Sequence, residues 1–279
     1  LWKKDTKDLL LAVPVTATAG YQASVPAVNI ARMLNQGTDI TLGSTGKINS
    51  GIGYEVTVNG SFLHNEISEL APGLTYITTI NPGFRGITPI RNGIGQSISS
   101  FYGYKVAGLF QNAGEVTGAP TQSGAAPGRF RYEDINSDGV INASDRTYIG
   151  SPVPKFTGGF NFTLRYSGFD LGGYLYTSLG GDIWNQSKWF TDFYPSFQGA
   201  AISERVKESW TPANTGATIP IFESASNFST NTQASSFYIE SGNYLRLQNI
   251  TLGYTLPANL LDRLKMTKLR VYGSLNNLF

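Results

Sequence analysis

The residues whose types and spacing most clearly suggest chemistry form one short acidic segment, residues 134–145. Its twelve positions fit the calcium-binding loop, in which oxygen ligands stand at positions 1, 3, 5, 7, 9 and 12. Gly139 occupies the sixth position, where the loop needs a sharp turn. We therefore predict a structural Ca²⁺ ion at this loop. Its expected ligands are Asp134, Asn136, Asp138, the Val140 carbonyl, Asn142 acting through water, and Asp145.

The calcium prediction has a simpler alternative, which is a turn rich in Asx residues that binds no ion. Asp145 stands where the usual loop has a glutamate, and its shorter side chain reaches less far. The flanking segments lack a helical pattern, because residues 129–133 are typical of an extended chain and Pro152 and Pro154 follow the loop. A regulatory calcium switch built on paired helices is therefore not expected.

A second candidate site is a group of aromatic residues in the long polar segment 180–236. Flat rings exposed in a loop can stack on sugars or cover peptides. On this basis four residues are predicted to contact a substrate: Trp184, Trp189, Tyr194 and Trp210. The alternative, which the sequence favours equally, is that these rings form only the packing core of the loop itself.

Composition argues against several other functions. The formal net charge is +2 and Lys and Arg form no cluster, so nucleic-acid binding has no support. The absence of cysteine and the presence of a single histidine argue against a zinc site. His64 is expected at the end of a strand, without the residues of a catalytic triad, and the acidic residues show no spacing typical of a glycosidase pair. We identify no catalytic residue and expect no enzyme.

The elements that must position these residues are β-strands with one apolar face. Glycine accounts for 32 residues, aromatic residues for 13% and charged residues for only 14%, a composition that favours strands over a helical bundle. Apolar and polar residues alternate with period two over residues 52–62, 156–166 and 269–276. A hairpin is expected at Ser167 and Gly168, and a slip in the alternation within 244–254 predicts a bulge near Gln248 and Asn249.

Strand length favours a membrane barrel over a globular β-protein. Several alternating runs reach the ~9 to 11 residues that cross a bilayer as a tilted strand, whereas globular strands average about 5 to 6. Short turns also alternate with long connections, as in outer-membrane barrels. We predict that one set of side chains faces lipid: Phe160, Phe162, Leu164, Leu171, Leu175, Val271 and Leu275. The opposite set should face the lumen: Asn161, Thr163, Arg165, Tyr174, Tyr176, Tyr272 and Ser274.

The alternative fold is a secreted, carbohydrate-binding β-sandwich, in which the same apolar residues would pack in a closed core between two sheets. Helical patterns are sparse, and only residues 257–265 and 200–210 are expected to form short helices. No run of apolar residues is long enough for a membrane-spanning helix. Neither end of the chain looks like a natural terminus, so we expect a fragment of a longer protein.

Several stretches carry a more specific signal when they are taken together. They are residues 6–10 with 35–39, 100–105 with 108–111, 134–139 continuing through 145–150 to 152–156, and 243–247 with 252–254. In this order, and across nearly the whole chain, they resemble the SusC/RagA family of TonB-dependent outer-membrane transporters of Bacteroidota.

The resemblance implies an all-β fold of antiparallel transmembrane strands, part of the family's 22-stranded barrel, with long extracellular loops. Residues 1–279 would form a partial barrel domain from the C-terminal half, with the plug, the TonB box and the final strands absent. The implied function is active import of a glycan or an oligopeptide across the outer membrane of a Gram-negative bacterium. The implied partners are a SusD-like surface lipoprotein, the TonB complex and outer-membrane lipid.

Overall fold

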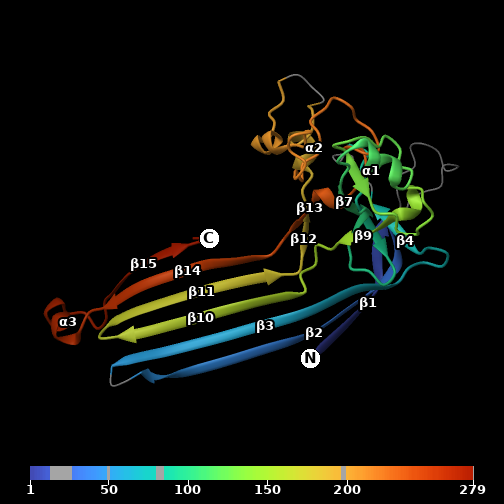
Figure 1. Ribbon diagram of the computed structural model, residues 1–279. Helices are drawn as coiled ribbons and strands as arrows, with labels where there is room; N and C mark the ends of the chain where they lie inside the picture. The colour runs from blue at the N-terminus through green and yellow to red at the C-terminus, as the bar shows by residue number, and fades with distance from the viewer. Residues whose placement is uncertain (13–26, 49–50, 80–84, 196–198, 279) are drawn as a thin grey trace.

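The computed structural model describes residues 1–12, 27–48, 51–79, 85–195 and 199–278 (Figure 1). Antiparallel β-sheet dominates, with a few short helices, which confirms the predicted all-β class. Within the described ranges, no helix is both long enough and apolar enough to cross a membrane.

The largest element is a seven-stranded antiparallel sheet with strand order β1-β2-β3-β10-β11-β14-β15. Each strand pairs with its neighbour along most of its length, so the sheet is one long, continuous surface (Figure 1). The strands are β1 (Trp2–Ala12), β2 (Ala27–Ile48), β3 (Ile52–Glu69), β10 (Phe156–Tyr166), β11 (Phe169–Leu179), β14 (Tyr244–Thr255) and β15 (Arg270–Asn276).

Short connections lie at one end of this sheet and long connections at the other (Figure 1). The predicted hairpin between β10 and β11 turns at Ser167 and Gly168, whose φ angles of 48° and 86° suit the tight turn that matches strand twist. β14 and β15 are joined through α3 (Ala258–Leu264), which confirms the helix expected over 257–265. Residues 70–155 and 180–243 form the long connections at the opposite end.

These long connections fold together into a second unit, called the cap below (Figure 1). It contains a four-stranded sheet of β4 (Tyr76–Thr79), β5 (Ile90–Gly93), β6 (Phe101–Tyr104) and β9 (Arg146–Gly150). Two small sheets join it, β7 (Val106–Leu109) with β8 (Phe130–Tyr132) and β12 (Asp182–Trp184) with β13 (Ile239–Ser241). The helices of the cap are α1 (Ala113–Gly118) and α2 (Ser187–Thr191).

The main hydrophobic core of the molecule lies in the cap and joins residues from both long connections. Gly103 allows β6 to approach the second connection closely, because a Cβ atom there would collide with the Ala234 carbonyl group. That carbonyl accepts the backbone N–H of Tyr104 at 2.8 Å. The buried core residues are Ile87, Tyr104, Leu109, Phe130, Tyr132, Ile141, Phe193, Trp210, Ala234 and Tyr238.

Two smaller predictions need correction. His64 lies well inside β3 rather than at a strand end, because β3 continues to Glu69. Its exposed ring lies 3.3 Å from Glu66, two residues further along the same face of the strand. The helix expected over 200–210 is only a short 3₁₀ helix, Glu204–Glu208. The Ser203 hydroxyl caps its start by accepting the backbone N–H of Arg205.

Candidate functional site

The seven-stranded sheet separates apolar and polar side chains onto opposite faces. Phe160 of β10 pairs with Val58 of β3 and Leu175 of β11, and residues paired across strands share a face. Leu171 of β11 pairs in turn with Leu252 of β14, so the same face continues toward β15. The seven side chains predicted to face lipid therefore lie on one face of the sheet. The seven predicted to face the lumen lie on the opposite face.

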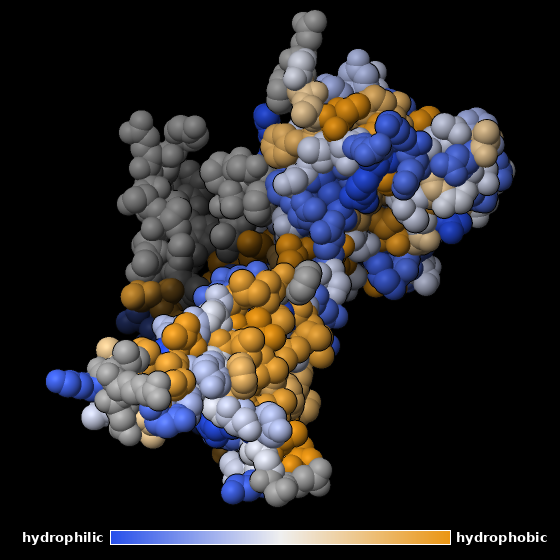
Figure 2. All heavy atoms as spheres, turned by 90° about the vertical axis from the view of Figure 1, so that its left-hand side faces the viewer, coloured by the Kyte–Doolittle hydropathy of each residue, from blue (hydrophilic) through white to orange (hydrophobic). Residues whose placement is uncertain are grey.

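The apolar face packs against no second sheet among the described residues. Phe160 is 39% exposed, Val271 62% and Leu275 59%, although a closed core would bury all three. Figure 2 shows a continuous apolar patch on the surface of the sheet. Exposed apolar patches of this extent mark a surface that meets another apolar phase. This exposure argues against the alternative of a sandwich core and agrees with the predicted barrel wall.

A bulge in β14 preserves this segregation where the sequence pattern slips. Tyr174 pairs with Asn249, but the next residue, Leu175, pairs with Leu247, so Gln248 is left as the extra residue. Without the bulge, the side chains of β14 before Gln248 would point to the wrong face. The structure thus confirms the bulge predicted at this position.

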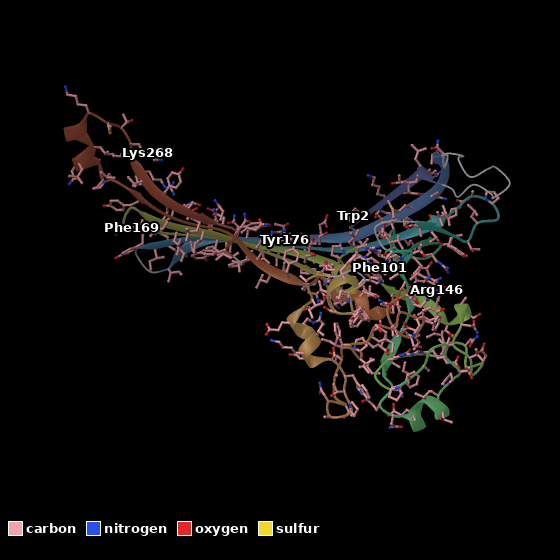
Figure 3. The ribbon with its side chains drawn as sticks, turned by 90° about the horizontal axis from the view of Figure 1, so that it is seen from above. Trp2, Phe101, Arg146, Phe169, Tyr176 and Lys268 are labelled. Atoms are coloured by element: carbon pink, nitrogen blue, oxygen red, sulfur yellow. The ribbon has the colours of Figure 1, made fainter. Side chains whose placement is uncertain are left out.

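The opposite face of the sheet is polar and carries ion pairs. Arg165 of β10 lies 3.3 Å from Glu55 of β3, and Nε of Arg270 donates to Asp170 at 2.9 Å. Figure 3 places Phe169 and Lys268 near the short-turn end of the sheet, Tyr176 in its middle, and Phe101 and Arg146 in the cap. The cap is anchored on this polar face, because the buried Asn65 of β3 accepts the backbone N–H of Ile98.

The acidic loop 134–145 lies in the cap and is held by its own hydrogen bonds. One carboxylate oxygen of Asp134 accepts the N–H of Gly139 at 2.8 Å, and its other oxygen is buried without a hydrogen-bond partner. Gly139 has a φ of 81°, which explains why glycine is needed there. The backbone N–H of Val140 and the amide of Asn136 hold the pKa of Asp138 below its ordinary value.

Asp145 serves first as an internal anchor of this loop. Its side chain is fully buried, and its two carboxylate oxygens accept the backbone N–H groups of Ile135 at 3.0 Å and Asn142 at 2.8 Å. Within the described part of the chain, no three His, Asp or Glu side chains gather so as to hold a metal ion. A cation here would therefore need amide and carbonyl oxygens, such as those of Asn136 and Val140, beside the carboxylate of Asp134.

The aromatic residues of the segment 180–236 contribute mainly to the cap core. Trp210 is only 5% exposed and its indole N–H donates to Gln111 at 2.8 Å, so it is a structural residue and not the exposed substrate contact that the sequence predicts. Trp184 and Trp189 are partly buried against the same core. Tyr194, by contrast, is 52% exposed, and its ring centre lies 5.5 Å from that of Phe222.

Sequence reasoning missed a second polar feature of the cap, formed by arginine and tyrosine side chains on the four-stranded sheet. Arg91 lies between the rings of Tyr76 and Tyr102, and Arg146 lies over Tyr102 as well. These residues are distant in sequence and belong to no motif. Only the pairing of β4, β5, β6 and β9 brings them together.

Comparison with known proteins gives a consistent result across the chain. No family model matches the sequence. The chain is 31% identical over 278 residues to TonB-dependent receptor P3 of Formosa agariphila, covering 98% of this chain and 26% of that protein. It is 23% identical over 283 residues to TonB-dependent receptor SusC of Bacteroides thetaiotaomicron, covering 99% of this chain and 26% of SusC. The chain thus spans about a quarter of the length of the curated relatives it matches.

The fold is shared with solved structures of the RagAB peptide transporter. One of them superposes with a TM-score of 0.78 at 23% identity, covering 99% of this chain and 28% of that one. RagAB in its open-open state superposes with a TM-score of 0.74. The seven-stranded sheet and the cap are therefore the barrel wall and loop architecture of such proteins. In sequence this chain is therefore similar to TonB-dependent receptors, SusC among them, and in fold it is similar to the RagAB structures.

Proposed function

We propose that this chain is part of an outer-membrane transporter that imports a nutrient with energy supplied by TonB. The observation that carries the proposal is the sheet, whose apolar face is continuous and exposed while its other face is polar. A sheet of this kind suits the wall of a barrel that has lipid outside and water inside. The cap would stand on the extracellular side, because it joins the strands at the end opposite the short turns.

The proposed substrate is a glycan or an oligopeptide, and the proposed surface partner is a SusD-like lipoprotein. Similarity to the RagAB peptide transporter supports the peptide, and the glycan alternative rests on the resemblance of the sequence to the SusC/RagA family. Tyr194, exposed beside the core of the cap, is the ring best placed to contact a substrate or the lipoprotein. The chain contributes binding and a passage, and no bond-making step is proposed for it.

Import and location can be tested on the full-length gene. We expect the protein in the outer-membrane fraction, released only by detergent. We also expect deletion of its gene to abolish growth on one nutrient, and complementation with the gene to restore that growth. A comparison of growth on single glycans and peptides would identify the substrate. A protein found soluble in the culture medium would contradict the proposal and favour a secreted binding module instead.

We also propose that the loop 134–145 holds a structural Ca²⁺ ion. Support comes from the buried Asp134 oxygen that has no hydrogen-bond partner, since such an oxygen costs free energy unless it is satisfied. The ion would also offset the repulsion between Asp134 and Asp138. Calorimetric titration of the full-length protein with Ca²⁺ should show binding that Asp134→Asn weakens, whereas Ser137→Ala should leave it unchanged. No heat of binding at millimolar Ca²⁺ would leave only the Asx-rich turn.

A further inference from the structure

The guanidinium group of Arg91 is held between two tyrosine rings. Its central carbon lies 3.3 Å from the ring centre of Tyr102 and 3.9 Å from that of Tyr76. β5 carries Arg91 and lies between β4, which carries Tyr76, and β6, which carries Tyr102. The sheet itself therefore fixes this sandwich, and the stacked rings stabilise the cation.

Among the described residues, Arg91 has no hydrogen-bond acceptor or ion-pair partner in spite of this fixed position. Its Nε atom is buried without a partner, and no described residue accepts a hydrogen bond from the group or forms an ion pair with it. Two other arginines of the cap do form ion pairs, Arg129 with Glu223 at 2.6 Å and Arg205 with Asp192 at 2.9 Å. Because rings cover both faces of Arg91, an acceptor can reach its N–H groups only in the guanidinium plane.

Neighbouring groups extend the positive site. Arg146 of β9 lies 5.1 Å from the ring centre of Tyr102, and its Nε is likewise buried without a partner. Tyr148 packs its ring edge-on against Tyr102 at 5.2 Å. Burial raises the pKa of Tyr148, which the charge of Arg91 opposes only in part, so its hydroxyl keeps the proton that it can donate. The cluster thus combines two cations with a hydroxyl donor and contains no carboxylate among the described residues.

We propose that this arginine–tyrosine cluster binds an oxyanion of the imported substrate. The oxyanion would be either a carboxylate or a sulfate group. Two oxygens of such a group match the two parallel N–H donors that a guanidinium presents in its plane. The rings of Tyr76 and Tyr102 fix the orientation of the Arg91 guanidinium group, so little side-chain entropy is lost on binding. The assignment of the anion to a substrate rests on the proposed import function. The competing source is an acidic side chain from the part of the full-length protein that lies outside this chain.

The test is anion binding to the full-length protein purified in detergent. The probes are sodium sulfate and sodium acetate, titrated by calorimetry at constant ionic strength with sodium chloride as the reference salt. Wild-type protein should bind at least one probe, and Arg91→Gln should weaken that binding about ten- to a hundredfold, as expected for the loss of charge-assisted hydrogen bonds. Arg131→Gln is the matched control, because Arg131 is an exposed arginine of the cap near Glu115, and it should bind like the wild type.

A second variant, Arg91→Lys, keeps the charge but not the planar fork, and it should bind with intermediate affinity. This keeps the test valid should Arg91→Gln fail to fold. No binding by the wild type would mean that another part of the protein already satisfies Arg91, and equal binding by both Arg91 variants would place the anion elsewhere. Either result would overturn the proposal. Nutrient uptake that is lost on gene deletion would still support import in both cases, so the two proposals fail separately.

Discussion

The substitution Phe160→Arg tests whether the apolar face of the sheet lies against lipid or against water. β10 has 11 residues, and at about 3.4 Å per residue with a tilt of about 40° it rises roughly 25 to 28 Å. The apolar band of an outer-membrane barrel is about 25 Å tall, so Phe160, one residue from the middle of the strand, lies near its midplane. An arginine there should cost about 2 to 4 kcal/mol, which shifts the folding equilibrium about 30- to 800-fold.

The matched control is Asn161→Arg, at the next residue on the polar face, where Asn161 pairs with Thr57 and Tyr174. It should change the free energy of unfolding by no more than about 0.5 kcal/mol, because the new charge meets water. Both variants of the full-length protein would be unfolded with denaturant in phospholipid vesicles and followed by tryptophan fluorescence. Equal destabilisation by the two variants, or a larger loss for Asn161→Arg, would refute the assignment of the faces.

Three further predictions concern the cap. Trp210→Ala should destabilise the cap by about 3 to 5 kcal/mol, because it leaves a cavity in the core, whereas Tyr194→Ala should cost about 0.5 kcal/mol or less; limited proteolysis would show the difference. Gly103→Ala should lower the melting temperature because its Cβ would meet the Ala234 carbonyl, and Gly118→Ala, which has open space, should not. The hydrogen bond from Lys188 lowers the pKa of Glu240 below 4.5, so the stability it adds is present above that pH and is lost as the pH falls through the lower, folded-state value. An acid titration of tryptophan fluorescence should show that loss in the wild type and a smaller one in Glu240→Gln.

The wall of the barrel was predictable from the sequence because its determinants are local. Three patterns, each within a few residues, determine which face a side chain occupies. They are the alternation with period two, the turn at Ser167 and Gly168, and the slip at Gln248. The length of β3 was harder to predict, since pairing with β2 extends it through His64 to Glu69. Cross-strand pairing there continues a strand beyond the point where its own sequence pattern ends.

The cap could not be predicted in the same way because its contacts join distant segments. The indole of Trp210 finds its acceptor on Gln111, 99 residues away, and no local pattern distinguishes a tryptophan of a core from one that meets a substrate. Arg91 likewise gains its surroundings only through strand pairing with β4 and β6. The acidic loop was recognised from its spacing, but the inward role of Asp145 depends on backbone N–H groups that spacing does not reveal.

The central claim, that one face of the sheet meets lipid and the other meets water, is tested most directly by single cysteines along β10. The chain contains no cysteine, so labels can be placed one at a time in residues 160–165 of the full-length protein once any cysteines elsewhere in it have been removed. Spin labels at 160, 162 and 164 should be relaxed by oxygen dissolved in the bilayer, and labels at 161, 163 and 165 by a water-soluble nickel complex. Accessibility that alternates with period two in opposite phase for the two reagents is the predicted result. Equal access of the nickel complex to all six positions would contradict it.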